Sequence, residues 1–169
     1  MLQSLLRVID KISPSTPVYA HCDIPCGIYD PHNAQMGAHT IVRMVNLLDE
    51  LQPSKAEPDF EERKRIISQI SRLTKVKEEH AEMVKKELRV LWADYFKEEH
   101  LKDYPTLHDT FWRALKLASK ARQEISIEAA KELLEQVQKI AEIFWKTKGM
   151  EPVRISSGYP TEGEIVSHK

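Results

Sequence analysis

The sequence predicts an all-α protein, an antiparallel four-helix bundle that follows an irregular N-terminal segment. Four stretches between residues 32 and 148 carry apolar side chains at intervals of three and four, the period of an amphipathic helix. Patterns typical of strands are nearly absent, and the connections between the four stretches are short. Helices of this kind bury their apolar faces against one another, and 169 residues suffice for one such domain.

The first helix is expected over residues 33–51 and the second over residues 58–96. Pro58 suits the first turn of the second helix, because a proline there costs no helical hydrogen bond. The apolar face predicted for the first helix consists of Met36, Thr40, Val42, Met44, Leu47, Leu48 and Leu51. The face predicted for the second consists of Ile66, Ile70, Leu73, Val84, Leu88 and Leu91.

Capping signals locate the starts of the third and fourth helices. Thr106, with Asp109 three residues later, has the pattern of a capping box, and Ser126 is a common N-cap residue. The third helix is predicted to bury Leu107, Phe111, Leu115 and Ala118. The fourth carries the clearest stripe, with Ile127, Ala130, Leu134, Val137, Ala141 and Phe144. We expect the three tryptophans, Trp92, Trp112 and Trp145, to anchor the core.

Both ends of the chain are expected to lie outside the bundle. Residues 149–169 are polar, contain glycine and proline, and lack a periodic pattern, which predicts a disordered tail. Residues 1–20 are interpreted as a short leader, since Val18 and Ala20 would suit a peptidase site just before His21. They lack the apolar core of a secretory signal, and an ordinary disordered N-terminus explains the same residues equally well.

Composition excludes several classes of protein. The net charge of -1 gives no sign of a nucleic-acid surface, and no stretch approaches eighteen apolar residues, so no membrane span is predicted. Two cysteines are too few for a disulfide framework. The glutamates before His80 and His100 have the wrong spacing for the Glu-x-x-His pairs of a di-iron bundle, and the His-Glu-x-x-His zinc motif is absent.

The segment HCDIPCGIYDP, residues 21–31, concentrates soft metal ligands. Cys22 and Cys26 are separated by three residues, and Pro25 and Gly27 bend the chain, so both thiolates can reach one ion. Two thiolates in a cytosolic protein favour a soft or borderline metal over a disulfide. Zinc would be the default metal, but a fourth ligand is not evident, and an incidental or redox-active cysteine pair is the alternative.

Cleavage between Ala20 and His21 would change this donor set. His21 would then supply a free α-amine as well as its imidazole, and the Cys22 amide would lie within the same chelate ring. Nitrogen and sulfur donors in a square plane point to nickel or copper rather than zinc.

At these residues the chain resembles the nickel-containing superoxide dismutases. HCDIPCGIYDP resembles their N-terminal nickel hook, VLWADYFKEEHLKDYPTLH (residues 90–108) resembles their second conserved block, and IFWKTK (residues 143–148) resembles their C-terminal end. The resemblance covers residues 20–150 and implies an antiparallel four-helix bundle. It also implies a cytoplasmic homohexamer with one nickel ion per chain, and a protease that removes the leader.

The resemblance further implies the site and its chemistry. The ligands would be the His21 amine, the Cys22 amide and the Cys22 and Cys26 thiolates, with the His21 imidazole axial in the oxidised state. The ion would cycle between Ni(II) and Ni(III) and disproportionate superoxide to dioxygen and hydrogen peroxide. Tyr29, Asp23 and Tyr95 would order water, supply protons and restrict access to small anions.

Two positions depart from the family pattern. Better-known members carry a glutamate that holds the hook imidazole and an arginine that supports it, where this chain has Gly37 and His80. Partners of this kind normally orient a ligating histidine, so we expect His80 or His39 to contribute instead, or water to fill the gap. Two other functions stay open: a module that stores or delivers nickel or copper through the same hook, and a helical scaffold with incidental cysteines.

Overall fold

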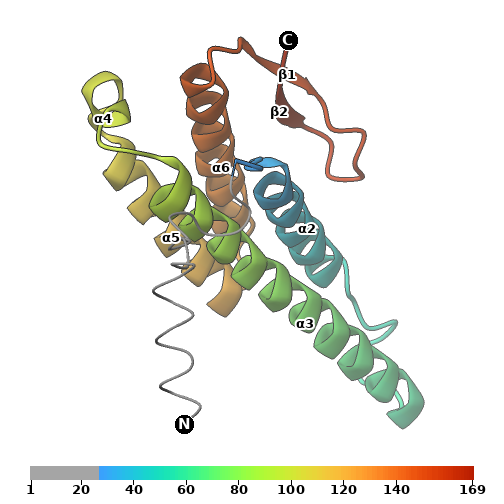
Figure 1. The fold of residues 1–169 in the computed structure, drawn as a ribbon. Helices are drawn as coiled ribbons and strands as arrows, with labels where there is room; N and C mark the ends of the chain where they lie inside the picture. Colours follow the sequence, from blue (N-terminus) through green and yellow to red (C-terminus); the bar gives the residue numbers. More distant parts are fainter. Residues whose placement is uncertain (1–26) are drawn as a thin grey trace, which may run out of the picture.

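The computed structural model describes residues 27–169 and is mostly helical (Figure 1). Its long helices are α2 (His32–Asp49), α3 (Phe60–Val90), α5 (Leu107–Gln123) and α6 (Ile127–Thr147). A π-helix, η1 (Leu91–Tyr95), continues α3, and a short helix, α4 (His100–Asp103), lies in the connection to α5. Two strands, β1 (Pro152–Ser156) and β2 (Glu164–His168), follow α6. The prediction of a mostly helical fold is confirmed, with helix boundaries close to those expected.

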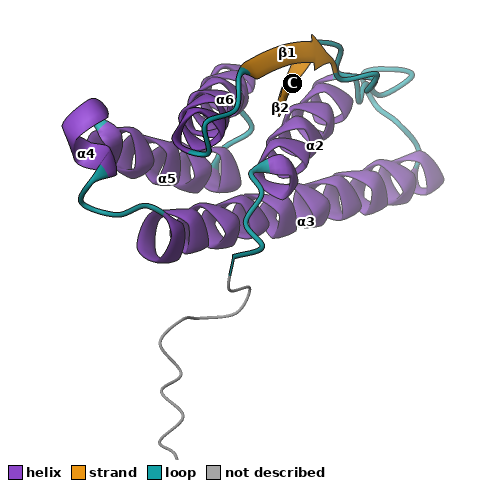
Figure 2. Ribbon diagram, turned by 45° about the horizontal axis from the view of Figure 1, so that its top comes forward, coloured by secondary structure: helices purple, strands orange, loops and turns teal. Residues whose placement is uncertain are grey.

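The four long helices surround one hydrophobic core. Helix α2 packs against α3 and α6, while α5 packs against α6 and α3, so each long helix contacts two others (Figure 2). The buried face of α2 is offset from the predicted one: Val42 and Leu48 are common to both, while Met36 is 36% exposed. That face consists of Ala34, Ala38, Ile41, Val42, Val45 and Leu48.

Helix α3 is buried only along its second half. Ile67 is 66% exposed and Phe60 71% exposed, and Ile70, predicted to face the core, is exposed as well. The physical reason is length: α3 has 31 residues and α2 has 18, so α3 extends beyond its partner (Figure 1). Periodicity predicted the helix correctly but not the length over which it is covered.

One of the two capping predictions is confirmed. The Ser126 hydroxyl accepts a hydrogen bond from the Ala129 amide at 3.1 Å, as an N-cap should. Thr106 makes no such bond, because its backbone (φ -91°, ψ 6°) is not in the extended conformation that an N-cap requires. Asp109 instead forms an ion pair with Arg113, one turn further along α5. The predicted capping box is therefore wrong.

A buried lysine joins α3 to the end of α5. The Lys77 ammonium donates to the backbone oxygens of Ala121 at 2.6 Å, Arg122 at 2.7 Å and Glu124 at 3.0 Å. These carbonyls lie at a helix C-terminus, where they lack helical partners and the helix dipole favours a cation. Burial lowers the pKa of Lys77, but the three acceptors satisfy all three of its N–H donors.

The C-terminal segment is ordered, which corrects the prediction of a disordered tail over 149–169. Strands β1 and β2 pair antiparallel, with Arg154 opposite Val166, and this hairpin lies over α6 and α2 (Figure 2). Val166 is buried in the core, and its backbone N–H and C=O both bond to the Gln35 side chain, at 2.6 and 3.0 Å. The segment is ordered by these long-range contacts. The composition and local pattern of a polar segment do not reveal such contacts. The strands also show that the chain is not entirely α-helical.

The tryptophan prediction is wrong for one residue. Trp145 is buried and Trp92 packs against the core, but Trp112 is 56% exposed on α5.

Candidate metal centre and active site

The predicted metal ligands lie outside the described residues. His21, Cys22 and Cys26, together with Asp23 and the cleavage position at Ala20, precede Gly27, where the described chain begins. Gly27 has a φ of +78°, a conformation that glycine adopts at little cost, and from there the chain leads through Tyr29 into α2. The structure therefore shows the surface onto which the hook segment leads.

The structure brings together Tyr29 and Tyr95, two residues to which the family resemblance assigns roles at the site. Their ring centroids are 5.5 Å apart with the planes tilted by 55°. Tyr29 lies just before α2, and Tyr95 ends η1, so elements far apart in sequence supply the pair. Two phenol groups thus converge where the hook segment enters the fold.

The Tyr95 hydroxyl is held by a residue that sequence reasoning missed. It lies 2.8 Å from Thr147 Oγ1, and Thr147 Oγ1 itself donates to the Phe144 carbonyl at 2.8 Å. Since a threonine hydroxyl has one proton, Tyr95 must be the donor in its bond to Thr147. The Tyr95 oxygen keeps its lone pairs for accepting a further hydrogen bond.

The π-helix sets the direction of Tyr95. The Phe96 amide donates to the Leu91 carbonyl at 3.0 Å, which widens the last turn by one residue relative to an α-helix. The Tyr95 ring then packs against Phe144 at 4.5 Å and Phe96 at 4.9 Å between ring centroids. Such π-turns are frequent at functional sites, although the sequence carries no clear signal for this one.

Lys148 brings a positive charge to the tyrosine pair. Its ammonium lies 3.5 Å from the Tyr29 carbonyl oxygen, 4.8 Å from the centre of the Phe144 ring and 6.0 Å from that of Tyr95. Lys148 is the last residue of the IFWKTK motif, and this position in the motif is the sequence signal that could have identified it as a site residue. An exposed cation here favours the approach of a small anion.

The two departures from the family pattern are neighbours in the structure. A Cβ atom at Gly37 would lie 2.7 Å from Val84 Cγ2, 2.9 Å from Met83 Cε and 3.4 Å from the His80 carbonyl oxygen. Glycine at 37 therefore allows α2 and α3 to approach more closely than a larger residue would permit. The His80 Nδ1–H donates to the Val76 carbonyl at 2.8 Å, which leaves Nε2 as the nitrogen that can accept a proton.

His39 has a different role from the one considered for it. Its Nε2–H donates to the Glu164 carbonyl at 3.0 Å, and its Nδ1 accepts from the Thr161 hydroxyl at 2.9 Å. Burial lowers the pKa of His39, and the bond to Glu164 opposes that shift in part. Both ring nitrogens of His39 are thus engaged by the hairpin.

The remaining geometry restricts where a metal can bind. Within residues 27–169, no group of three or more His, Cys, Asp or Glu side chains is arranged to hold an ion. The donors of the hook segment, two thiolates with nitrogen ligands, suit nickel by their chemistry. None of the helices in the described part of the chain is long and apolar enough to cross a membrane.

A helical fold that carries a tyrosine pair, preceded in sequence by a histidine and two cysteines, is consistent with a redox metalloprotein. Residues 16–148 match the family model described as nickel-containing superoxide dismutase. Nickel superoxide dismutases from Streptomyces coelicolor and Streptomyces seoulensis are each 35% identical over 136 residues, covering 80% of this chain and 94% of theirs.

Solved structures agree with this match. The native structure of a nickel superoxide dismutase has a TM-score of 0.62 and 33% identity, and covers 76% of this chain and 99% of its own. A structure with nickel ligation of the oxidised state has a TM-score of 0.60 and 34% identity, with the same coverage. The chain belongs to the nickel-containing superoxide dismutase family: it is an oxidoreductase that acts on superoxide, and nickel is its cofactor. The match to the family model ends at Lys148, so the hairpin lies beyond it.

Proposed function

We propose that this chain disproportionates superoxide to dioxygen and hydrogen peroxide at a hook formed by residues 21–31. The amine and imidazole of His21, the amide and thiolate of Cys22 and the thiolate of Cys26 would hold one nickel ion. Bound there, the ion would supply one-electron chemistry between Ni(II) and Ni(III), which anionic sulfur and amide donors make accessible. The observation that carries the proposal is the contact between Tyr29 and Tyr95 where the hook meets the helices.

The chain's own residues would guide the anion and its protons. Lys148 gives the entrance a positive charge that attracts superoxide. Tyr95, with its proton directed to Thr147, presents an oxygen that can accept a bond from water or peroxide. Tyr29 and Asp23 would order the water that delivers the two protons peroxide requires. The two tyrosine rings would also limit access to small species.

The finer organisation follows the family. Residues 1–20 would be a leader that a protease removes to free the His21 amine, and residues 32–148 would form the antiparallel four-helix bundle. We propose a cytoplasmic homohexamer, in which each chain carries one hook. His80 would take the place of the pair that usually steadies the hook imidazole, through its Nε2.

The test compares the full chain with a chain that begins at His21. Native mass spectrometry would give the N-terminus and metal content, and a superoxide assay the activity. We expect nickel and activity only with a free His21 amine. Full activity with bound nickel in a chain that still begins at Met1 would contradict the amine ligand. A processed chain that holds zinc and lacks activity would favour metal storage.

A variant pair separates the tyrosines from metal binding. Tyr95→Phe should retain nickel and lose activity, whereas Cys22→Ser should lose both. Tyr104→Phe, a partly buried tyrosine outside the pair, is the matched control and should change neither.

A further inference from the structure

The C-terminal hairpin is attached to the helices at defined points. Gln35 is fully buried and bonds to both backbone groups of Val166, while the Gln138 amide donates to the Glu164 carbonyl. Arg154 of β1 forms an ion pair with Glu142 of α6 at 2.7 Å. Buried amides that match the backbone of β2 fix the position of the hairpin, and with it the loop over residues 157–163.

That loop and α2 together border an open cavity of about 300 Å³. The floor is one face of α2, whose residues recur every three or four positions, and the loop supplies the wall; Figure 1 shows the two side by side. The floor consists of Met36, His39, Thr40, Arg43 and Met44, and the wall consists of Tyr159, Pro160 and Thr161. The lining is mostly apolar, and its volume lies at the lower end of the range for small-molecule sites.

The His39 and Thr40 side chains of the cavity are engaged in hydrogen bonds, whereas the Arg43 guanidinium is not engaged by any residue of the described chain. His39 bonds to Thr161 and Glu164, and the Thr40 hydroxyl donates to the Met36 carbonyl. Arg43 is half-buried, and in the described part of the chain its guanidinium has neither an ion pair nor a hydrogen bond. The cavity therefore combines an apolar surface with a cation that lacks an acidic partner among residues 27–169.

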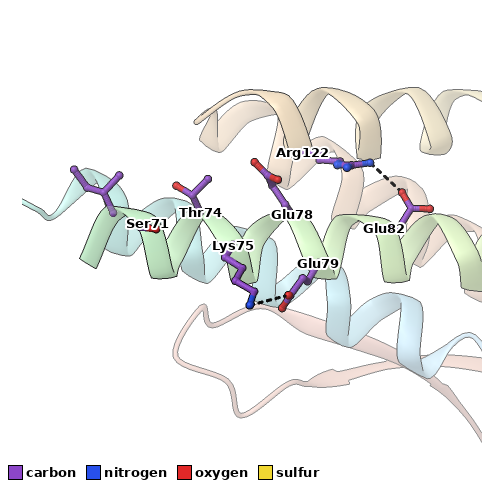
Figure 3. Close-up of a pocket in the computed structure, with 8 residues that line it drawn as sticks. Ser71, Thr74, Lys75, Glu78, Glu79, Glu82 and Arg122 are labelled. Atoms are coloured by element: carbon purple, nitrogen blue, oxygen red, sulfur yellow. Dashed lines mark hydrogen bonds and ion pairs between the residues drawn. The ribbon is translucent and has the colours of Figure 1, made fainter. Parts of the chain in front are cut away.

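A second hollow, along α3, shows the opposite arrangement. It measures about 590 Å³, and both of its cations already have acidic partners, with Lys75 3.7 Å from Glu79 and Arg122 3.3 Å from Glu82 (Figure 3). A third carboxylate, that of Glu78, also lines this hollow, so its lining residues offer no unpaired cation to an anion. The contrast identifies the Arg43 guanidinium, unpaired among the described residues, as the distinguishing feature of the hairpin cavity.

We propose that the cavity between α2 and the hairpin loop binds a small organic carboxylate with an aromatic or aliphatic body. The planar guanidinium of Arg43 matches a carboxylate with two parallel hydrogen bonds. The body of the ligand packs against Met36, Met44 and the Tyr159 ring. The site lies beyond the family match on its hairpin side, and it stands independently of the hook chemistry.

Calorimetric titration of the purified, nickel-loaded protein tests this site. The probe is 4-phenylbutyrate, and 4-phenylbutanol is its neutral counterpart. We expect one saturable site per chain for the acid and at least tenfold weaker binding of the alcohol. Arg43→Gln should weaken binding of the acid at least tenfold without changing superoxide activity. The affinity of Arg43→Lys for the acid should lie between those of the parent protein and Arg43→Gln. Tyr159→Ala should weaken both compounds.

Arg113→Gln, a change of the same kind at an exposed arginine of α5, is the matched control and should leave binding unchanged. The proposal would be overturned if the acid showed no saturable binding. It would also be overturned if Arg43→Gln bound the acid as tightly as the parent protein, or if the parent protein bound the alcohol as tightly as the acid. A change in oligomer size in Arg43→Gln or Tyr159→Ala on sedimentation would overturn it as well, because the cavity would then belong to an interface between chains.

Discussion

The close approach of α2 and α3 at Gly37 predicts that one added methyl group destabilises the protein. In Gly37→Ala, the new Cβ would lie 2.7 Å from Val84 Cγ2 and 2.9 Å from Met83 Cε. The end of the methionine can move aside, but Val84 is fully buried and its branched side chain has few rotamers. The backbones must therefore separate, or Val84 must strain.

Two effects of opposite sign decide the magnitude. Alanine is favoured over glycine within a helix by about 1 kcal/mol, which would stabilise the variant. Overpacking a close-fitting core costs about 1–3 kcal/mol, and a contact this short belongs toward the upper end. We expect the free energy of unfolding to fall by about 1–2 kcal/mol. Gly37→Glu, the residue of better-known family members, should lose more than about 3 kcal/mol because it also buries a charge.

Urea unfolding at fixed protein concentration measures this effect. A cycle with Val84→Ala isolates the contact, and the double variant should recover about 1 kcal/mol relative to the sum of the single changes. The matched control compares Glu79→Gly with Glu79→Ala at an exposed site of α3, which reports helix propensity alone. If Gly37→Ala is stabilised by as much as the control, the helices are not in close contact and the reasoning is refuted.

Three further predictions follow from other contacts. Lys77→Met should lower the free energy of unfolding by about 3–5 kcal/mol in urea, because buried carbonyls lose a charged donor; a loss below about 1 kcal/mol would contradict the buried cap. Burial holds the pKa of His39 below its usual 6.5, so the unfolded chain binds more protons and stability falls as pH drops through the folded pKa. Compared with the parent protein, His39→Gln should show a flatter decline between about pH 7 and pH 5 in thermal unfolding, and an unchanged slope would remove His39 as the cause. Thr147→Val removes the acceptor of the Tyr95 proton and should lower kcat roughly tenfold at unchanged nickel content; an unaltered kcat would show that this hydrogen bond is unimportant.

Local patterns predicted the helices well and their surroundings less well. Periodicity located the four long helices, and Ser126 was recognised as a cap because its bond reaches only three residues. Trp112 was expected in the core but is exposed, since periodicity shows that a helix has an apolar face without showing how much of it is covered. The same reason explains the uncovered first half of α3.

Tyr29 and Tyr95 were each singled out from motifs, but neither their contact nor the groups that position Tyr95 were predicted. Each of the two tyrosines lies in a sequence block that resembles the family, so the motifs alone were enough to identify them as candidate site residues. Thr147 and the π-turn of η1 act through hydrogen bonds between elements distant in sequence. No local pattern marks such bonds.

By itself the sequence determined the helical fold and predicted the donor atoms of the hook, because helix periodicity and a ligand cluster are properties of neighbouring residues. Only the tertiary structure decided that residues 149–169 are ordered, that Gly37 serves helix packing and that Arg43 faces a cavity. Each of these depends on contacts between separate elements of the fold. Gln35, for example, is an unremarkable helical residue until β2 places Val166 against it, 131 positions later. Burial and hydrogen-bond satisfaction are properties of the assembled core, and they become visible only when its parts are in place.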